Sequence, residues 1–235
     1  MKIVRRGYDP SDYKIFSEEN LKKLKTAQEE IQWLLDRGYK IKQVIEFVGN
    51  HYLLSARERM ALQRATSPTV EYEMRKSKML PLDKAKDGCL LIDGFNLIIT
   101  LEVALSGSPI ILGKDQVMRD LAGLRGTYRI IDKTKIALEL MGKTFEDLSV
   151  PMVKIFLDSP VSNSGMLRRE ILEYSKSWNI PVEVELIDKV DTVLSDEERI
   201  VTSDSIILDK CKSWFNLSRK IVEDYIKEAW IIDLS

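Results

Sequence analysis

Five short apolar runs, separated by helical patterns, constrain the fold of this chain more than any other sequence feature. The runs follow one another after residue 88, at residues 89–93, 153–157, 182–187, 199–203 and 229–234. The segments between them carry apolar residues at helical spacing. Strands that alternate with helices form crossover units, which place the strands parallel in one sheet. We therefore expect an α/β domain over residues 81–235, with a largely parallel sheet of about five strands flanked by helices.

The clearest of the intervening helical patterns covers residues 115–131. Its apolar residues would form one stripe: Val117, Leu121, Leu124, Tyr128 and Ile131. Gly123 and Gly126 lie inside the pattern, where each would cost about 1 kcal/mol relative to Ala. We therefore expect close packing of this helix against another element.

Residues 1–80 have a different texture and are interpreted as a small all-helical domain. Three amphipathic helices are predicted within residues 17–66. Ser17 begins the first with an acidic turn, Gly49-Asn50 has the character of a C-cap of the second, and Ser55-Ala-Arg-Glu58 is a capping box for the third. From residue 66 to 87 the chain is polar, with two prolines, so we place the domain boundary there.

The third predicted helix presents Arg57 and Arg64 on one face, because they are seven residues apart. Such a helix is compatible with a helix-turn-helix that enters the major groove of DNA. A simple packing module is the alternative, and both remain open. Arg57 and Arg64 are accordingly the candidate nucleic-acid-binding residues of this part.

Charge is distributed unevenly behind a formal net charge of -1. Residues 1–80 contain 16 Lys+Arg and 11 Asp+Glu, whereas residues 81–235 contain 20 and 26. A basic surface suits an anionic partner, although ordinary solvated faces would give the same counts. The sequence shows no signal peptide and no apolar run of about 18 residues, and its two cysteines are far apart. We expect a cytoplasmic protein with reduced thiols and no membrane partner.

Aspartates follow the apolar runs where the predicted strands end. Asp93 ends the first run, Asp158 the second, Asp191 comes shortly after the third, and Asp204 follows the fourth. The carboxyl ends of parallel strands meet at one edge of a sheet, so these carboxylates should converge. Converging carboxylates repel one another unless they are protonated or bridged by a cation, and Mg²⁺ or Mn²⁺ prefers such oxygen ligands. The pattern predicts a metal site able to hydrolyse phosphodiesters. Helix N-caps or turn residues are the alternative for each aspartate.

Two further sets of residues are candidates for binding substrate. Ser162, Asn163 and Ser164 precede a helical pattern at residues 166–177, where hydroxyls and amides could hold a phosphate. An ordinary N-cap loop is the alternative. Arg119 and Arg125, on the helix predicted at residues 115–131, could reach substrate phosphates or could simply be solvated.

Asp93-Gly-Phe-Asn96 after an apolar strand, with Thr202-Ser-Asp204-Ser near the end, resembles the PIN/NYN-like nuclease superfamily. The resemblance covers about residues 86–235. It implies a parallel sheet of the 3-2-1-4-5 type and a Mg²⁺ or Mn²⁺ site that cuts RNA or DNA. Position by position, Asp93 matches the first metal ligand, Asn96 the residue that orients it, and Asp204 the late acidic ligand.

The middle acid of the superfamily matches either of two residues, Asp120 and Glu102. Asp120 would lie beside the apolar stripe of the helix predicted at residues 115–131, and Glu102 would lie on the helix after the first strand, where a solvated position is as compatible. The whole chain also resembles an uncharacterised prokaryotic family that pairs a helical N-terminal part with a PIN-like C-terminal part. The resemblance leaves a homodimer as an open alternative to a monomer.

Two classes of function remain open from the sequence. The first is a metal-dependent nuclease with catalytic Asp93, Asp120, Asp158 and Asp204, for which RNA is the expected substrate and DNA the alternative. The second is a non-catalytic nucleic-acid- or nucleotide-binding protein, or a scaffold, with a degenerate PIN-like domain. A haloacid dehalogenase phosphatase is excluded because Asp93 does not begin an Asp-x-Asp motif, and no P-loop or Gly-x-Gly-x-x-Gly is present.

Overall fold

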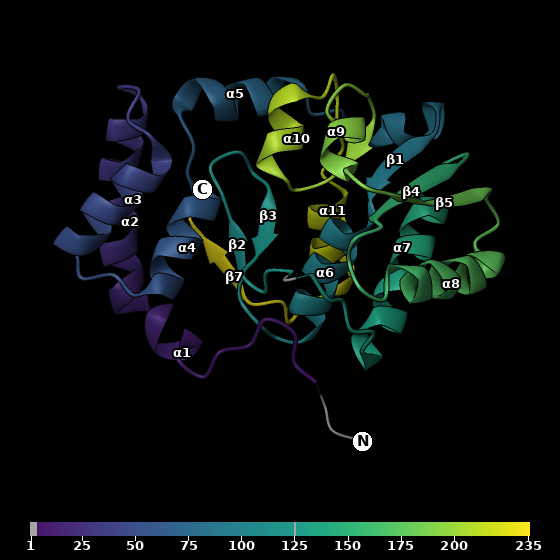
Figure 1. Ribbon diagram of the computed structural model, residues 1–235, viewed down its shortest axis with the longest axis horizontal. Coiled ribbons are helices and arrows are strands. Elements are labelled where there is room, and N and C mark those ends of the chain that lie inside the picture. Colours follow the sequence, from purple (N-terminus) through teal and green to yellow (C-terminus); the bar gives the residue numbers. More distant parts are fainter. Residues whose placement is uncertain (1–3, 125) are drawn as a thin grey trace.

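Four parallel strands form the central sheet of the protein (Figure 1). The computed structural model describes residues 4–124 and 126–235. The strands lie in the order β5-β4-β1-β6, and their bounds are Leu90–Asp93 (β1), Val153–Asp158 (β4), Val182–Ile187 (β5) and Ile200–Val201 (β6). Each neighbouring pair is parallel, so all four carboxyl ends lie at one edge. The predicted parallel α/β arrangement is confirmed for these four strands.

The last predicted strand belongs to a second sheet. β7 (Ile231–Asp233) pairs in parallel with β2 (Ile110–Leu112), which pairs antiparallel with β3 (Met118–Asp120). This three-stranded sheet lies between the N-terminal helices and the rest of the molecule (Figure 1). The prediction of about five strands in one sheet is therefore wrong. The C-terminal strand β7 pairs instead with the β2–β3 hairpin, which lies between β1 and β4 along the sequence.

The helix predicted at residues 115–131 does not form. Its first part holds the turn and the strand β3 of the β2–β3 hairpin, and the described residues between β3 and α7 (Asp132–Asp147) contain no helix. Gly123 and Gly126 adopt φ values of +62° and +69°, which a right-handed helix cannot contain. A Cβ at either glycine would meet nothing within 4 Å, so the expected close packing there is also wrong. The apolar residues of the predicted stripe belong to three different cores, with Val117, Leu121 and Tyr128 in one each.

Helices cover both faces of the parallel sheet. Alternate residues of one strand belong to different cores, as expected when side chains point to opposite faces. Ile155 and Leu157 of β4 pack in the core that also contains residues of α6 (Gly94–Leu105), α7, α8 (Ser164–Tyr174) and α11 (Leu217–Tyr225). Phe156, between them, packs in a smaller core with residues of α9 (Val190–Leu194) and α10 (Ser205–Lys210).

The N-terminal region is helical, as predicted. Its helices are α1 (Asp12–Ile15), α2 (Glu18–Leu35), α3 (Ile41–His51), α4 (Ala56–Ala65) and α5 (Thr69–Ser77), with a short 3₁₀ helix at Leu82–Asp87. The Ser17 cap and the Ser55–Glu58 capping box are both present. No helix in the described part of the chain is long and apolar enough to cross a membrane.

Two details of this helical region differ from the expectations. Gly49-Asn50 does not end α3, which continues to His51; Gly49 is buried where Arg59 of α4 crosses it, and a Cβ there would lie 2.7 Å from the guanidinium carbon. The segment expected to be a polar linker contains α5. Thr69 begins that helix, and its backbone N–H and hydroxyl donate to the Asp36 carboxylate at the end of α2. A tertiary contact therefore orders the linker.

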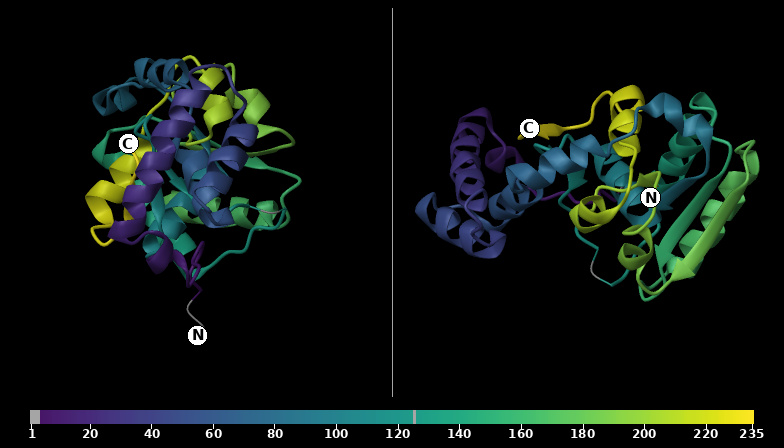
Figure 2. Two further views of the ribbon diagram at one scale, coloured as in Figure 1. Left: turned by 90° about the vertical axis from the view of Figure 1, so that its left-hand side faces the viewer. Right: turned by 90° about the horizontal axis from the view of Figure 1, so that it is seen from above.

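The helices α2, α3 and α4 complete their hydrophobic core with the three-stranded sheet. Ile111 of β2, Leu121, and Ile232 and Leu234 at the C-terminus pack among the apolar faces of these helices. The buried Gln28 side chain of α2 also donates to the backbone carbonyl of Leu234 at 2.8 Å. Seen from above, the helices lie at one end of the molecule and β5 at the other, with the second sheet between them (Figure 2). The C-terminal strand thus joins the two parts of the chain.

A buried ion pair fastens the N-terminal segment to α6. Arg6 pairs with Glu102, whose side chain is inaccessible to solvent and also accepts hydrogen bonds from the hydroxyls of Tyr128 and Thr134. Burial raises the pKa of the Glu102 carboxyl, and Arg6 counteracts this by favouring its charged form. A solvated position for Glu102 is therefore wrong. As an alternative middle acid it faces Arg6 rather than the strand ends.

We expect Arg6→Met to lower the free energy of unfolding by about 3 kcal/mol, because a buried carboxylate left without its cation is strongly destabilising. Urea denaturation measures the change. Arg5→Met is the matched control, since Arg5 lies in the same segment and donates only to the carbonyls of Ser106 and Gly107. Its loss should stay near 1 kcal/mol. Equal losses in the two variants would show that the ion pair does not fasten this segment.

Candidate functional site

Side-chain hydrogen bonds join the turn after β1 to the turn after β6. The Thr202 hydroxyl donates to Asp93 Oδ2 at 2.9 Å. The backbone N–H and the hydroxyl of Ser203 both donate to Asn96 Oδ1, at 2.7 and 2.9 Å. The Asn96 side chain therefore holds the Ser203-Asp204 turn, whereas only its backbone N–H reaches Asp93, at 3.3 Å. The motifs quoted from the sequence thus form one hydrogen-bonded unit.

Gly94 allows this unit to lie against the sheet. A Cβ at this position would lie 2.7 Å from side-chain atoms of both Ile155 and Leu157 on the neighbouring strand β4. Since neither branched side chain can move away inside the core, a larger residue would push the first turn of α6 outward. The glycine after Asp93 is thus required by close approach.

Four aspartates form an acidic cluster at the carboxyl edge of the sheet: Asp93, Asp158, Asp191 and Asp204. Asp93 is buried, and its pKa is raised to about 7, first by burial and further by the charges of Asp204 and Asp158. Burial and the same two neighbours raise the pKa of Asp191, and burial raises that of Asp158. Within the described residues none of the four forms an ion pair. The structure therefore brings the four predicted aspartates together as an uncompensated negative charge.

Three members of the acidic cluster also bond to the start of a helix. Asp93 caps α6, Asp204 caps α10 through the N–H of Ile206 at 2.7 Å, and Asp158 accepts from the N–H of Val190 in α9 at 3.3 Å. Capping and ligand binding are compatible, because a carboxylate has about four acceptor positions and a cap uses one of them. The helix-cap alternative is therefore true of these residues, and it does not exclude a ligand at the edge that they share.

The donor chemistry of the acidic cluster fits a hard divalent cation, but its side chains do not enclose one point. Across residues 4–124 and 126–235, no group of three His, Cys, Asp or Glu side chains stands in an arrangement that could hold a metal ion. Asp93 is the buried member, whereas Asp158 and Asp204 are half-buried and Asp191 is exposed. Asp158 and Asp204 are each held by one hydrogen bond from a helix, which leaves their other acceptor positions open to a ligand. Asp188, by contrast, is held by the Ser159 hydroxyl.

Asp120 stands apart from the acidic cluster. It lies at the end of β3, not on the predicted helix, and accepts hydrogen bonds from the Thr100 hydroxyl at 3.3 Å and the Ala122 N–H at 2.8 Å. None of these bonds involves one of the four clustered aspartates. Its expected position on a helix face looking into the site is wrong, because the helix does not exist.

Arg119 supports the site rather than offering a free charge to a substrate. Its guanidinium pairs with buried Asp115 at 2.6 Å, and its Nε donates to the carbonyl of Ser203 at 2.8 Å. Arg75 of α5 binds the same Asp115 at 3.0 Å and Asp209 of α10 at 2.6 Å. Sequence reasoning missed Arg75 and Asp115, because residues 40 apart give no local sign that they meet. The expectation of a solvent-facing Arg119 is wrong.

The loop before α8 uses its polar groups to hold a neighbouring segment. The backbone of Ser162 bonds to Gly126 and Tyr128, and the Asn163 amide donates to the Tyr128 carbonyl at 2.7 Å. The Ser164 hydroxyl donates to the carbonyl of Ser159 at 3.4 Å. These contacts favour the ordinary loop over the phosphate-binding alternative. Arg125, the other predicted substrate residue, lies outside the described residues.

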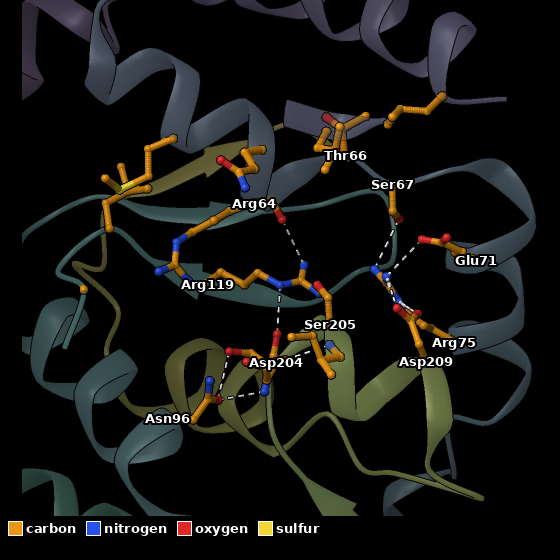
Figure 3. A pocket seen from close by; sticks show the side chains of 18 of the residues that line it. Arg64, Thr66, Ser67, Glu71, Arg75, Asn96, Arg119, Asp204, Ser205 and Asp209 are labelled. Carbon is orange, nitrogen blue, oxygen red and sulfur yellow. Dashed lines mark hydrogen bonds and ion pairs between the residues drawn. The ribbon is translucent and has the colours of Figure 1, made fainter. Parts of the chain in front are cut away.

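A cleft of about 740 Å³ opens between the site and the N-terminal helices (Figure 3). Asn96 and Asp204 lie on one side of it, and Arg57 and Arg64 of α4 on the other. Arg57 is engaged by the buried Asp12 at 2.8 Å and by backbone carbonyls, so its main role is structural. The sequence placed both arginines on one helix face but did not indicate that this face borders the acidic site.

We expect the stability of the protein in EDTA to fall as the pH rises from about 5 to 8. The pKa of Asp93 in the folded state, about 7, exceeds its ordinary value of 3.8. Stability linked to a raised pKa is present below the ordinary value and lost as the pH rises through the folded one. Asp93→Asn should flatten this fall in urea denaturation. The exposed Asp188→Asn, as control, should keep it. A wild-type profile without this fall would contradict the raised pKa of Asp93.

Comparison with known proteins gives family membership. The family described as Domain of unknown function (DUF5616) matches residues 82–220, and that described as Protein of unknown function (DUF434) matches residues 23–78. An uncharacterized protein of Methanocaldococcus jannaschii is 34% identical over 206 residues, which covers 88% of this chain and 96% of that protein. No solved structure matches the chain significantly. The DUF5616 match spans more than half of this chain, so the chain belongs to the family of the domain of unknown function DUF5616.

Proposed function

We propose that this protein is a Mg²⁺- or Mn²⁺-dependent phosphodiesterase that cuts nucleic acid, with RNA, rather than DNA, as the first substrate to test. The observation that carries the proposal is the uncompensated acidic cluster at the carboxyl edge of the sheet. Four carboxylates held together without a cationic partner are unfavourable unless a ligand rewards the arrangement. A divalent cation is the simplest such ligand, since it prefers carboxylate and water oxygens.

Within this proposal the residues have separate tasks. Asp93 is the fixed ligand, because Thr202 and the first turn of α6 hold its two oxygens. Asp158 and Asp204 would complete the set with the acceptor positions that their helix hydrogen bonds leave open, and Asp191 with its exposed carboxylate. When bound, the metal would supply a Lewis acid and a water of lowered pKa. Asn96 keeps Asp204 in place through Ser203, and it acts as a positioning residue.

A PIN-like fold is part of the proposal. Numbered along the chain, the four parallel strands have the spatial order 3-2-1-4, which is the order of the first four strands in the 3-2-1-4-5 sheet that the sequence resemblance implies. The two resembling motifs also follow the first and fourth of these strands. A fifth strand beside β6 is absent from the described part of the chain, where the last strand instead joins β2.

A second function has one observation in its favour. Because no three acidic side chains enclose a point in the described residues, the cluster could belong to a protein that binds nucleic acid or nucleotide without cutting it. The two functions differ in one measurable property, which is saturable binding of a divalent cation by the acidic cluster.

Calorimetric titration of Mn²⁺ into the wild type at about pH 8, where Asp93 is ionised, should give saturable binding. The Asp93→Asn/Asp204→Asn variant should lose this binding, because the substitutions remove two of the four carboxylates of the acidic cluster. Asp188→Asn is the matched control. Asp188 also follows a strand of the sheet, β5, but its carboxylate is bound by the Ser159 hydroxyl and is not part of the acidic cluster. Its binding should equal that of the wild type.

Cleavage of a labelled single-stranded RNA in Mn²⁺ should follow the same order among the variants. Metal binding that survives in the double variant would place the metal elsewhere. Absence of both binding and cleavage in the wild type would leave the non-catalytic function in first place.

A further inference from the structure

The cleft beside the acidic cluster has walls from two parts of the chain that are far apart in sequence. Met60 and Arg64 of α4 lie on the helical wall, whereas Asn96, Asp204 and Ile206 lie on the wall that carries the site. Figure 3 shows Arg64 coming from the helical side and Asn96 and Asp204 from the opposite side of the same space. The N-terminal helices are therefore in a position to contact whatever reaches Asp204.

Arg64 differs from the other arginines of the cleft in having no counter-charge. Arg57 is paired with Asp12, Arg119 with Asp115, and Arg75 with both Asp115 and Asp209. The Arg64 side chain forms no ion pair and no hydrogen bond with any described residue; only its backbone carbonyl is used, by Arg119. It is half-buried, so its charge is not fully solvated either.

A half-buried guanidinium without a partner favours an anion with several acceptor oxygens. Phosphate is the best match, because the planar fork of Arg can bind two of its oxygens at once. On the facing wall, the carboxylate of Asp204, the member of the acidic cluster that lines the cleft, would repel a phosphate unless a metal ion lay between them. The helical wall thus offers a direct phosphate contact, and the facing wall would offer one through a cation if Asp204 helped to hold the ion.

The size of the cleft limits the form of the ligand. Its volume of about 740 Å³ lies within the range of about 300–1,000 Å³ usual for small-ligand sites. Such a space accepts one or two nucleotides of a flexible strand but is too small to enclose a double helix, one turn of which is about 34 Å long. Apolar side chains that include Ile41, Met60 and Ile206 offer surfaces for the faces of bases.

We propose that this cleft binds one unpaired strand of nucleic acid, and that Arg64 binds a phosphate of that strand from the helical wall. What happens to the strand at the acidic cluster rests on the proposed function, but binding by Arg64 does not. Major-groove recognition by α4 is replaced by this proposal, because the face that carries Arg64 is turned toward the cleft and Arg57 is committed to Asp12.

Fluorescence anisotropy with labelled ten-nucleotide RNA and DNA strands tests the proposal on the full chain. Titrations in EDTA and in Ca²⁺ show whether a cation is needed for binding. Arg64→Ala should weaken binding about tenfold, as expected for loss of one hydrogen-bonded charge contact. It should also reduce the salt dependence by about one phosphate contact, or about 0.7 in the slope of log K against log salt.

Two variants serve as controls for Arg64→Ala. Arg64→Lys should recover part of the affinity, since a point charge remains without the fork. Arg169→Ala should bind like the wild type, because Arg169 is an exposed residue of α8 that is absent from the cleft lining. A hairpin whose paired stem is as long as the labelled strands should bind more weakly than either single strand.

Three results would overturn the inference: no binding of either strand by the wild type in both buffers, unchanged affinity in Arg64→Ala, or equal affinity for the duplex. These results are independent of the metal titration. If Mn²⁺ fails to bind while Arg64→Ala still weakens strand binding, the cleft holds strands without cutting them. If Mn²⁺ binds while Arg64→Ala has no effect, the acidic cluster acts on some other phosphodiester.

Discussion

The buried carboxylate of Asp115 is the contact on which the arrangement of the site depends. It lies between two guanidinium groups, Arg75 of the N-terminal part and Arg119 of the β2–β3 hairpin. Burial alone would raise the pKa of Asp115, but Arg119 and Arg75 lower it, so the residue is held ionised. Through Arg119 the same group reaches the carbonyl of Ser203, next to Asp204. The ion pairs of Asp115 and the hydrogen bond of Arg119 therefore connect the helical part, the second sheet and the candidate site.

The charges around the site fall into two groups that behave differently. Three buried carboxylates outside it have charged partners: Asp12 with Arg57, Glu102 with Arg6, and Asp115 with its two arginines. The acidic cluster and Arg64 have none in the part of the chain that the structure describes. An acidic cluster and an arginine that both lack a counter-charge suit ligands of both signs, as a phosphodiester with its metal ion would be.

Patterns that depend on neighbouring residues could be interpreted correctly from the sequence. The capping box at Ser55 and Glu58 and the strand at Val182–Ile187 each depend on a short stretch of sequence. Both were predicted within their observed bounds. The segment at residues 115–131 was misinterpreted for the opposite reason. Its apolar spacing matches a helix, but Gly123 and Gly126 adopt left-handed conformations. The strand β3 in this segment pairs with β2, and β2 pairs in turn with β7, more than 110 positions away.

By itself the sequence determined that Asp93, Asp158 and Asp204 follow strands, and the parallel order of those strands then required the carboxylates to meet at one edge. Only the tertiary structure decided which charged groups remain free. Arg57, Arg64, Arg119 and Asp120 are equivalent in the sequence as charged residues on predicted helices, yet three of them are occupied by partners and only Arg64 is not. The physical reason is that ion pairs and hydrogen bonds form between groups brought together by packing, whatever their separation along the chain.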